Sequence, residues 1–132
     1  MIKKQFTLYL ENRQGVLAGV TAKLAAAKVN IEGISVAEST DVAIVQVVVD
    51  NAAATKRAFD KAGIPFTVQD VAMVHLSHQP GELAKILTKV ARDGININYV
   101  YATGCDCKSD CNCYAIIGAD NLKKVEKAWK NA

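Results

Sequence analysis

The strongest constraint on the fold of this chain is an internal repeat. A shift of 66 residues places residues 15–31 over residues 81–97 with seven identities. Further along the chain the matching shift becomes 70, which places residues 50–51 over residues 120–121. Self-similarity at a fixed distance is the mark of a repeated structural unit. We therefore expect two copies of one module, with four extra residues between the two matching regions of the second copy.

The two copies, residues 1–69 and residues 70–132, have the same expected order of elements. In each, a strand with period-2 alternation precedes a helix with 3.6-residue spacing, and two β-rich runs and a second helix follow. The first copy places them at residues 6–10, 16–24, 31–37, 42–49 and 52–62, with a last strand at 66–69. The second copy places them at residues 71–76, 83–90, 95–103, 114–117 and 122–130, and stops before the counterpart of the last strand. Asn51 and Asn121 are expected to cap the second helix of each copy.

This order predicts an α+β fold of two ferredoxin-like (βαββαβ) modules with antiparallel sheets, the second lacking its last strand. Residues 42–49 are apolar on both faces of their strand, so the face away from the helices needs a second cover. The missing last strand also leaves an edge open in the second copy. These two features predict a homodimer.

Composition narrows the classes of partner. Hydrophobic residues make up 51% and charged residues 22% of the 132 residues, which supports a buried core and excludes intrinsic disorder. The net charge of +3 and the scattered lysines argue against nucleic acid and anionic membranes as partners. No run approaches the roughly 20 apolar residues of a membrane span, and the start lacks the apolar region of a signal peptide. We expect a cytoplasmic protein.

Two segments carry a recognisable pattern. Asn12-Arg-Gln-Gly15-Val-Leu-Ala, with Asn-Ile at residues 30–31, resembles the ACT domain, a small-molecule sensing module of amino-acid metabolism. His78-Gln-Pro-Gly81-Glu-Leu-Ala, with Asn-Ile at residues 96–97, resembles it again. The resemblance covers essentially the whole chain and implies a stand-alone tandem ACT protein that binds a free amino acid and is not an enzyme.

The chemistry of the motif suits such a ligand. A helix start led by glycine offers unpaired N–H groups and a partial positive charge to a carboxylate, and an asparagine amide can both donate and accept. In ACT domains this loop and the asparagine line an effector site, commonly between two modules. The resemblance assigns two sites: Asn12, Gly15, Val16, Leu17, Asn30 and Ile31 in the first copy, and His78, Gly81, Glu82, Leu83, Asn96 and Ile97 in the second. The alternative is that these glycines and asparagines only serve turns and helix exits.

All four cysteines lie in the extra segment, residues 104–113, with the spacing C-x-C-x₃-C-x-C. If this segment extends a hairpin, Cys107 lies opposite Cys111 and Cys105 lies opposite Cys113, with all four thiols on one side. Four thiolates could bind Zn²⁺, Cu(I) or an iron site. The same geometry would permit two disulfides, which a reducing compartment disfavours, and inert thiols are the third alternative.

No G-x-S-x-G, P-loop or H-E-x-x-H motif is present, so the sequence predicts no enzyme and no required cofactor. The leading interpretation is a non-enzymatic regulatory protein that binds a free amino acid. One alternative is a metal- or redox-responsive regulator acting through the cysteines. Another is a regulatory subunit of an amino-acid biosynthetic enzyme such as acetolactate synthase.

Overall fold

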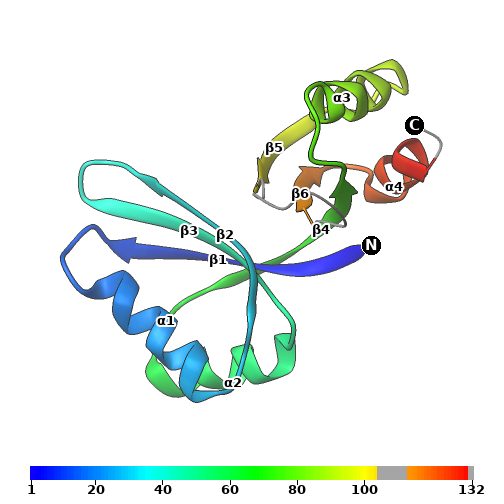
Figure 1. Ribbon diagram of the computed structural model, residues 1–132. Helices are drawn as coiled ribbons and strands as arrows, with labels where there is room; N and C mark the ends of the chain where they lie inside the picture. Colours follow the sequence, from blue (N-terminus) through cyan, green and yellow to red (C-terminus); the bar gives the residue numbers. More distant parts are fainter. Residues whose placement is uncertain (104–112, 131–132) are drawn as a thin grey trace. The chain divides into compact units, whose positions relative to one another are not determined.

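The computed structural model describes residues 1–103 and 113–130 and confirms the expected order of elements (Figure 1). The elements are β1 (Ile2–Glu11), α1 (Val16–Ala26), β2 (Ile31–Glu38), β3 (Val42–Val49), α2 (Ala52–Ala62), β4 (Thr67–Leu76), α3 (Glu82–Arg92), β5 (Ile97–Ala102), β6 (Cys113–Ala119) and α4 (Leu122–Lys130). They form two compact units. The first unit is Lys4–Gln69, and the second unit is Met1–Lys3 together with Asp70–Ala132.

The first unit has the strand order β2-β3-β1-β4, to which β4 contributes its first residues, Thr67–Gln69. Because side chains alternate across a strand, Leu8 and Val45, which lie opposite each other, face the helices and are buried. The next pair, Tyr9 and Ile44, faces away and is exposed. Antiparallel pairing of β1, β2 and β3 and two helices on one face give a ferredoxin-like unit, as expected.

Three phenylalanines form the centre of the core of the first unit. Phe6 of β1 meets Phe59 of α2 edge-on, with ring centroids 5.9 Å apart. Phe66, just before β4, lies 5.3 Å from Phe6 and 5.9 Å from Phe59. Aromatic rings in these orientations add to the stabilisation from their buried area. The cluster ties the second helix to the sheet.

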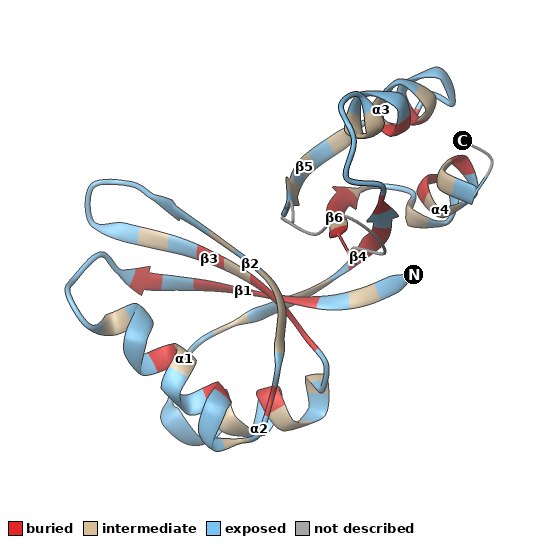
Figure 2. Ribbon diagram, viewed as in Figure 1, coloured by how far each residue is buried: buried red, intermediate tan, exposed pale blue. Residues whose placement is uncertain are grey.

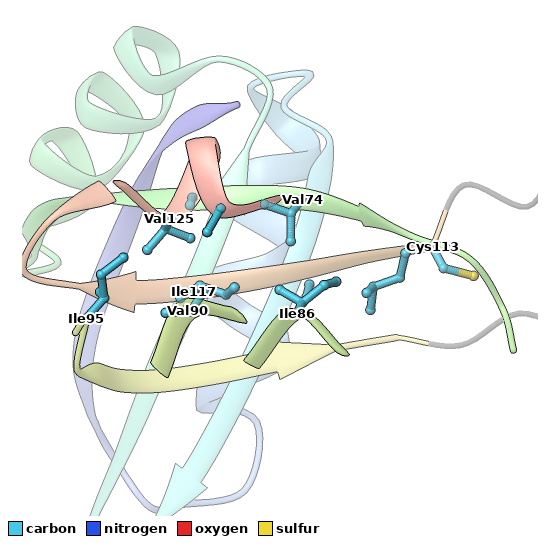
Figure 3. Packing of buried hydrophobic residues seen from close by; sticks show 11 residues of the cluster. Val74, Ile86, Val90, Ile95, Cys113, Ile117 and Val125 are labelled. Atoms are coloured by element: carbon cyan, nitrogen blue, oxygen red, sulfur yellow. The ribbon is translucent and has the colours of Figure 1, made fainter. Parts of the chain in front are cut away.

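The core of the second unit is aliphatic. β6 lies between β4 and β5 and pairs antiparallel with both. Figure 3 shows Val74, Ile117, Ile86, Val90 and Val125 gathered between the strands and the two helices. The two units therefore bury the same face of the same repeat with different side chains.

The strand expected to be missing from the second unit is supplied by the N-terminus. Met1 and Met73 exchange two backbone hydrogen bonds, of 3.2 and 2.8 Å, as an antiparallel pair does. The amino group of Met1 also lies 3.2 Å from a carboxylate oxygen of Glu126 on α4. The strand order of the second unit is therefore β1-β4-β6-β5, with Met1–Lys3 at one edge. The edge that the sequence left open at β4 is covered.

The helix ends follow the sequence signals. Asn51 accepts a hydrogen bond from the N–H of Ala54 at 3.0 Å, and Asn121 accepts one from the N–H of Lys124 at 3.1 Å, which confirms both predicted caps. Gly63, in the left-handed region at φ +69°, ends α2. None of the helices in the described ranges is long and apolar enough to cross a membrane.

The two units differ at one equivalent position of their sheets. In the first unit Gly33 of β2 lies opposite Val48 of β3, whereas in the second unit Tyr99 of β5 lies opposite Gly118 of β6. A Cβ added to Gly118 would lie 2.2 Å from the ring of Tyr99. The large and the small residue have exchanged strands between the copies, and each sheet keeps one glycine for its neighbour.

Candidate ligand-binding site

Each unit begins its first helix at a glycine in the left-handed region. The φ angles of Gly15 and Gly81 are +86° and +88°, and neither helix has a side-chain cap. A Cβ at either glycine would meet no atom within 4 Å, so the requirement for glycine comes from the backbone angle rather than from crowding. The repeat therefore preserves a specific backbone turn at both helix starts.

The turn leaves N–H groups free at both helix starts. In α1 the N–H of Val16 donates to Arg13 and that of Gly19 donates to Gly15, while those of residues 17–18 have no acceptor within the described ranges. In α3 the corresponding free N–H groups belong to residues 83–84. Free N–H groups at the positive end of a helix are suited to an anionic group such as a carboxylate.

Within the first unit the expected site residues lie at two ends of one helix. The Asn12 side chain donates to the carbonyl of Ser39 at 3.3 Å, and its N–H donates to Asp41 at 2.9 Å, so it lies at the β2–β3 hairpin. Asn30 follows α1, whose eleven residues span about 16 Å. The structure brings Asn12, Gly15, Val16 and Leu17 together and places Asn30 and Ile31 at the far end of the helix.

Asn30 is held by its backbone alone. Its N–H donates to a carboxylate oxygen of Asp50 at 2.9 Å, and its carbonyl accepts from the N–H of Asp50 at 3.1 Å. Its exposed side-chain amide makes no hydrogen bond with a described residue. In the second unit the amide of Asn96 donates to Asn98 at 3.2 Å, and Asn98 donates to Asp120 at 3.2 Å. The two equivalent asparagines therefore differ in their freedom to bind a ligand.

A pocket of about 400 Å³ lies at the start of α3 in the second unit. It is lined by Leu76, Ser77, His78, Gln79, Pro80, Glu82, Leu83, Thr103 and Cys113. It therefore brings together three of the expected residues, His78, Glu82 and Leu83, while Asn96 and Ile97 lie at the other end of α3. No motif in the sequence marks Thr103, Leu76 or Cys113 as a wall of this pocket.

Cys113 is the one cysteine inside the described ranges. Its side chain is 2% exposed and packs in the core of the second unit, opposite Leu76 in the register of β4 and β6 (Figure 3). Cys105, Cys107 and Cys111 lie outside the described residues, so the proposed metal site and the alternative disulfides remain predictions. Within residues 1–103 and 113–130, no three His, Cys, Asp or Glu side chains are placed to bind a metal ion.

Two ferredoxin-like units, each with a glycine-led helix start, define the architecture of a paired ACT domain. The chain matches the family of the ACT domain pair over residues 1–127 and belongs to it, as its two loop motifs implied. No curated protein matches the chain.

Solved structures share the whole fold. Protein BT0572 from Bacteroides thetaiotaomicron has 27% identity and a TM-score of 0.87, covering 99% of this chain and 88% of that chain. The regulatory subunit of aspartate kinase from Thermus thermophilus has 19% identity and a TM-score of 0.71, covering 100% and 95%. The corresponding subunit from Thermus flavus has 16% identity and a TM-score of 0.62, covering 98% and 91%. At these identities, the likeness to the two aspartate kinase subunits establishes the fold.

Proposed function

We propose that the chain is a non-enzymatic regulatory protein that binds a free amino acid at its glycine-led helix starts. The observation that carries this proposal is that two free N–H groups follow the glycine at the start of each first helix, Gly15 and Gly81. In the second unit these groups lie beside a pocket. Membership of the ACT domain pair family supports it.

The pocket of the second unit offers a partner for each part of an amino acid. The N–H groups of residues 83–84 and the helix dipole suit the carboxylate. The carboxylate of Glu82 suits the ammonium group, and the apolar walls at Leu76 and Leu83 suit a side chain. In the first unit Val16 replaces Glu82, so the two sites differ in charge.

We place the complete first site between two copies of the chain. Since Asn30 and Gly15 lie at opposite ends of α1, one ligand cannot touch both within one unit. The free amide of Asn30 would instead complete a site at the Gly15 loop of a partner in a homodimer. Exposed apolar residues support such an association: Tyr9 and Ile44 on the face of the sheet away from the helices, and Ile34 and Val36 on the edge strand β2.

The regulated partner is proposed to be an amino-acid biosynthetic enzyme. The similar structures from Thermus are described as regulatory subunits of aspartate kinase, and they match nearly the whole length of this chain. Co-purification of such an enzyme with the chain, and its loss on adding the effector, would support this assignment.

The test is binding of each of the twenty amino acids by isothermal titration calorimetry. Thr103→Trp fills the pocket of the second unit and should weaken binding at least about tenfold, which is about 1.4 kcal/mol. Ala37→Trp, at the repeat-equivalent position of the first unit, is the matched control and should leave binding at the pocket of the second unit unchanged. Asn30→Ala should weaken the binding free energy by about 1–3 kcal/mol at the site proposed between two copies. Folded protein that binds no amino acid would disprove the proposal.

A further inference from the structure

The first helix of the chain is apolar on its outward side. Lys23 is the only charged residue of α1, and Leu17, Ala18, Ala22 and Ala25 are all exposed. Figure 2 shows this outward surface of α1 in the colour of exposed residues. Apart from Lys23 this exposed side carries no charge, and an exposed apolar patch on a protein surface often marks an interaction site. The outer face of α1 therefore has the composition of an interface.

The equivalent helix of the second unit is more polar on this side. At the positions of Gly19, Ala22 and Ala26, α3 carries Lys85, Thr88 and Arg92, while the exposed alanines at residues 84 and 91 keep those at residues 18 and 25. Both helices derive from the same repeat and bury the same inner positions. The three polar replacements make the outer face of α3 more polar than that of α1, so an uncharged outer face at these positions is not needed to form the fold.

Beside this face, α1 and α2 enclose a groove of about 580 Å³. Its lining consists of five alanines, called the alanine floor below, and three cationic side chains, called the cationic rim. The alanines are Ala26, Ala27, Ala54, Ala58 and Ala62, and the cations are Lys23, Arg57 and Lys61. All of these residues belong to the first unit. In the second unit Arg92, Asp93 and Lys124 occupy the positions of Ala26, Ala27 and Ala54, so the repeat does not reproduce the alanine floor.

The charge around the groove has one sign. Lys23, Arg57 and Lys61 form no ion pair with a residue in the described ranges. Asp60 is the only acidic residue of either helix, and it is not part of the groove lining. The groove therefore combines an apolar floor with uncompensated positive charge.

We propose that this groove binds an acidic amphipathic helix of a partner protein. Leucine-type side chains would enter between the alanines, and flanking carboxylates would meet Lys23, Arg57 and Lys61. Electrostatic attraction of this kind speeds association and selects the partner. This inference does not depend on the amino-acid site, because the groove and the glycine-led loops share no residue.

Two other occupants fit less well. A two-fold contact with a second copy would place the same three cations opposite themselves, and like charges repel. A phosphate group would pair with the three cations but would leave the five alanines without an apolar partner. An acidic helix satisfies both the apolar floor and the cationic rim.

The experiment uses the full chain and a labelled peptide of about four helical turns, with leucines at helical spacing and glutamates elsewhere. Fluorescence anisotropy should detect binding that weakens as salt rises, and a lysine version of the peptide should not bind. The double variant Arg57→Glu with Lys61→Glu should weaken binding at least about tenfold. Lys56→Glu, on the same helix but outside the groove lining, and Lys127→Glu, the repeat counterpart of Arg57, should leave it unchanged.

Ala54→Lys separates docking in the groove from general charge attraction. It introduces the residue found in the second unit, fills the groove and adds a positive charge, so docking predicts weaker binding whereas charge attraction alone predicts stronger binding. Thermal unfolding confirms that each variant is folded. The proposal would be overturned by tighter binding to Ala54→Lys, by equal loss in the control variants, or by no peptide binding at all. A duplex DNA, an anionic vesicle or self-association that depended on the same residues without a preference for the peptide would also overturn it.

Discussion

The two units complete their sheets in different ways. The first unit ends with residues that follow its own second helix, Thr67–Gln69, whereas the second unit takes Met1–Lys3 from the other end of its sequence. β1 and β4 thus each contribute residues to both units. The difference shows that a sequence repeat defines which residues share a core face, while the edge of a sheet can be filled by any strand that is within reach.

The two cores also differ in which side chains fill them. Phe59 is fully buried against two other phenylalanine rings in the first unit, and its counterpart in the second unit, Trp129, is only half-buried at the margin of an aliphatic core. At the sheet position where Gly33 meets Val48, the second unit has Tyr99 over Gly118. The backbone pattern is kept, and the volumes are compensated locally.

The largest effect should come from removing the aromatic centre of the first unit. Phe59→Ala should lower the free energy of unfolding by about 3–5 kcal/mol, because a large buried ring leaves a cavity that its neighbours cannot fill. Trp129→Ala should lower the free energy of unfolding clearly less, since that side chain is only partly buried. Chemical denaturation of both variants measures the difference, and equal losses would show that the two positions carry equal weight.

A smaller effect should follow from placing the first unit's residue in the second unit. Gly118→Val should lower the free energy of unfolding by about 1–3 kcal/mol, because the valine side chain would overlap the ring of Tyr99. Combined with Tyr99→Gly, the change recreates the pair Gly33 and Val48 of the first unit, and the loss should be partly recovered. A double-mutant cycle measures this coupling. Strictly additive losses would contradict local compensation.

The smallest effect should come from weakening the edge strand of the second unit, in which Met1–Lys3 pair with β4. Replacing Ile2 and Lys3 by glycine should lower the free energy of unfolding by about 1–2 kcal/mol, because each glycine in a strand costs about 0.5–1 kcal/mol of stability. Hydrogen exchange of the Met73 N–H, which donates to Met1, should speed up in this variant. Glycine at Thr67 and Val68, the matching edge of the first unit, is the control and should leave the exchange of Met73 slow. Unchanged exchange in the first variant would argue against the pairing of Met1 with Met73.

The repeat and its periodicity were sufficient to predict the elements, the helix caps at Asn51 and Asn121 and the inward faces of the strands, because these depend on neighbours close in sequence. They could not predict that Met1–Lys3 pairs with a strand about seventy residues later, since edge pairing carries no periodic signal. Helical spacing identifies the buried side of α1 and gives no signal for what its exposed apolar side contacts.

The candidate site was predictable in its local parts only. Gly15 and Gly81 were identified from their place before a helix, and both have the positive φ that such a turn requires. The separation of Asn30 from Gly15 follows from the sequence, because the eleven residues of α1 lie between them and a helix of that length spans about 16 Å. The contribution of Cys113 and Thr103 to the pocket depends on how β5, β6 and the loop before α3 meet in space.

The pairing of Met1 with Met73 also has a consequence for how the chain folds. The contact joins residues 72 positions apart, and Met1 is made long before Met73 leaves the ribosome. The first unit has all its strands after residue 69 is made, whereas the second unit must wait for residues of α4 and also capture the opposite end of the chain. Closing so long a loop is slow. Cutting the gene between the two repeats would therefore yield one half with a complete sheet and another with an unpaired, aggregation-prone edge.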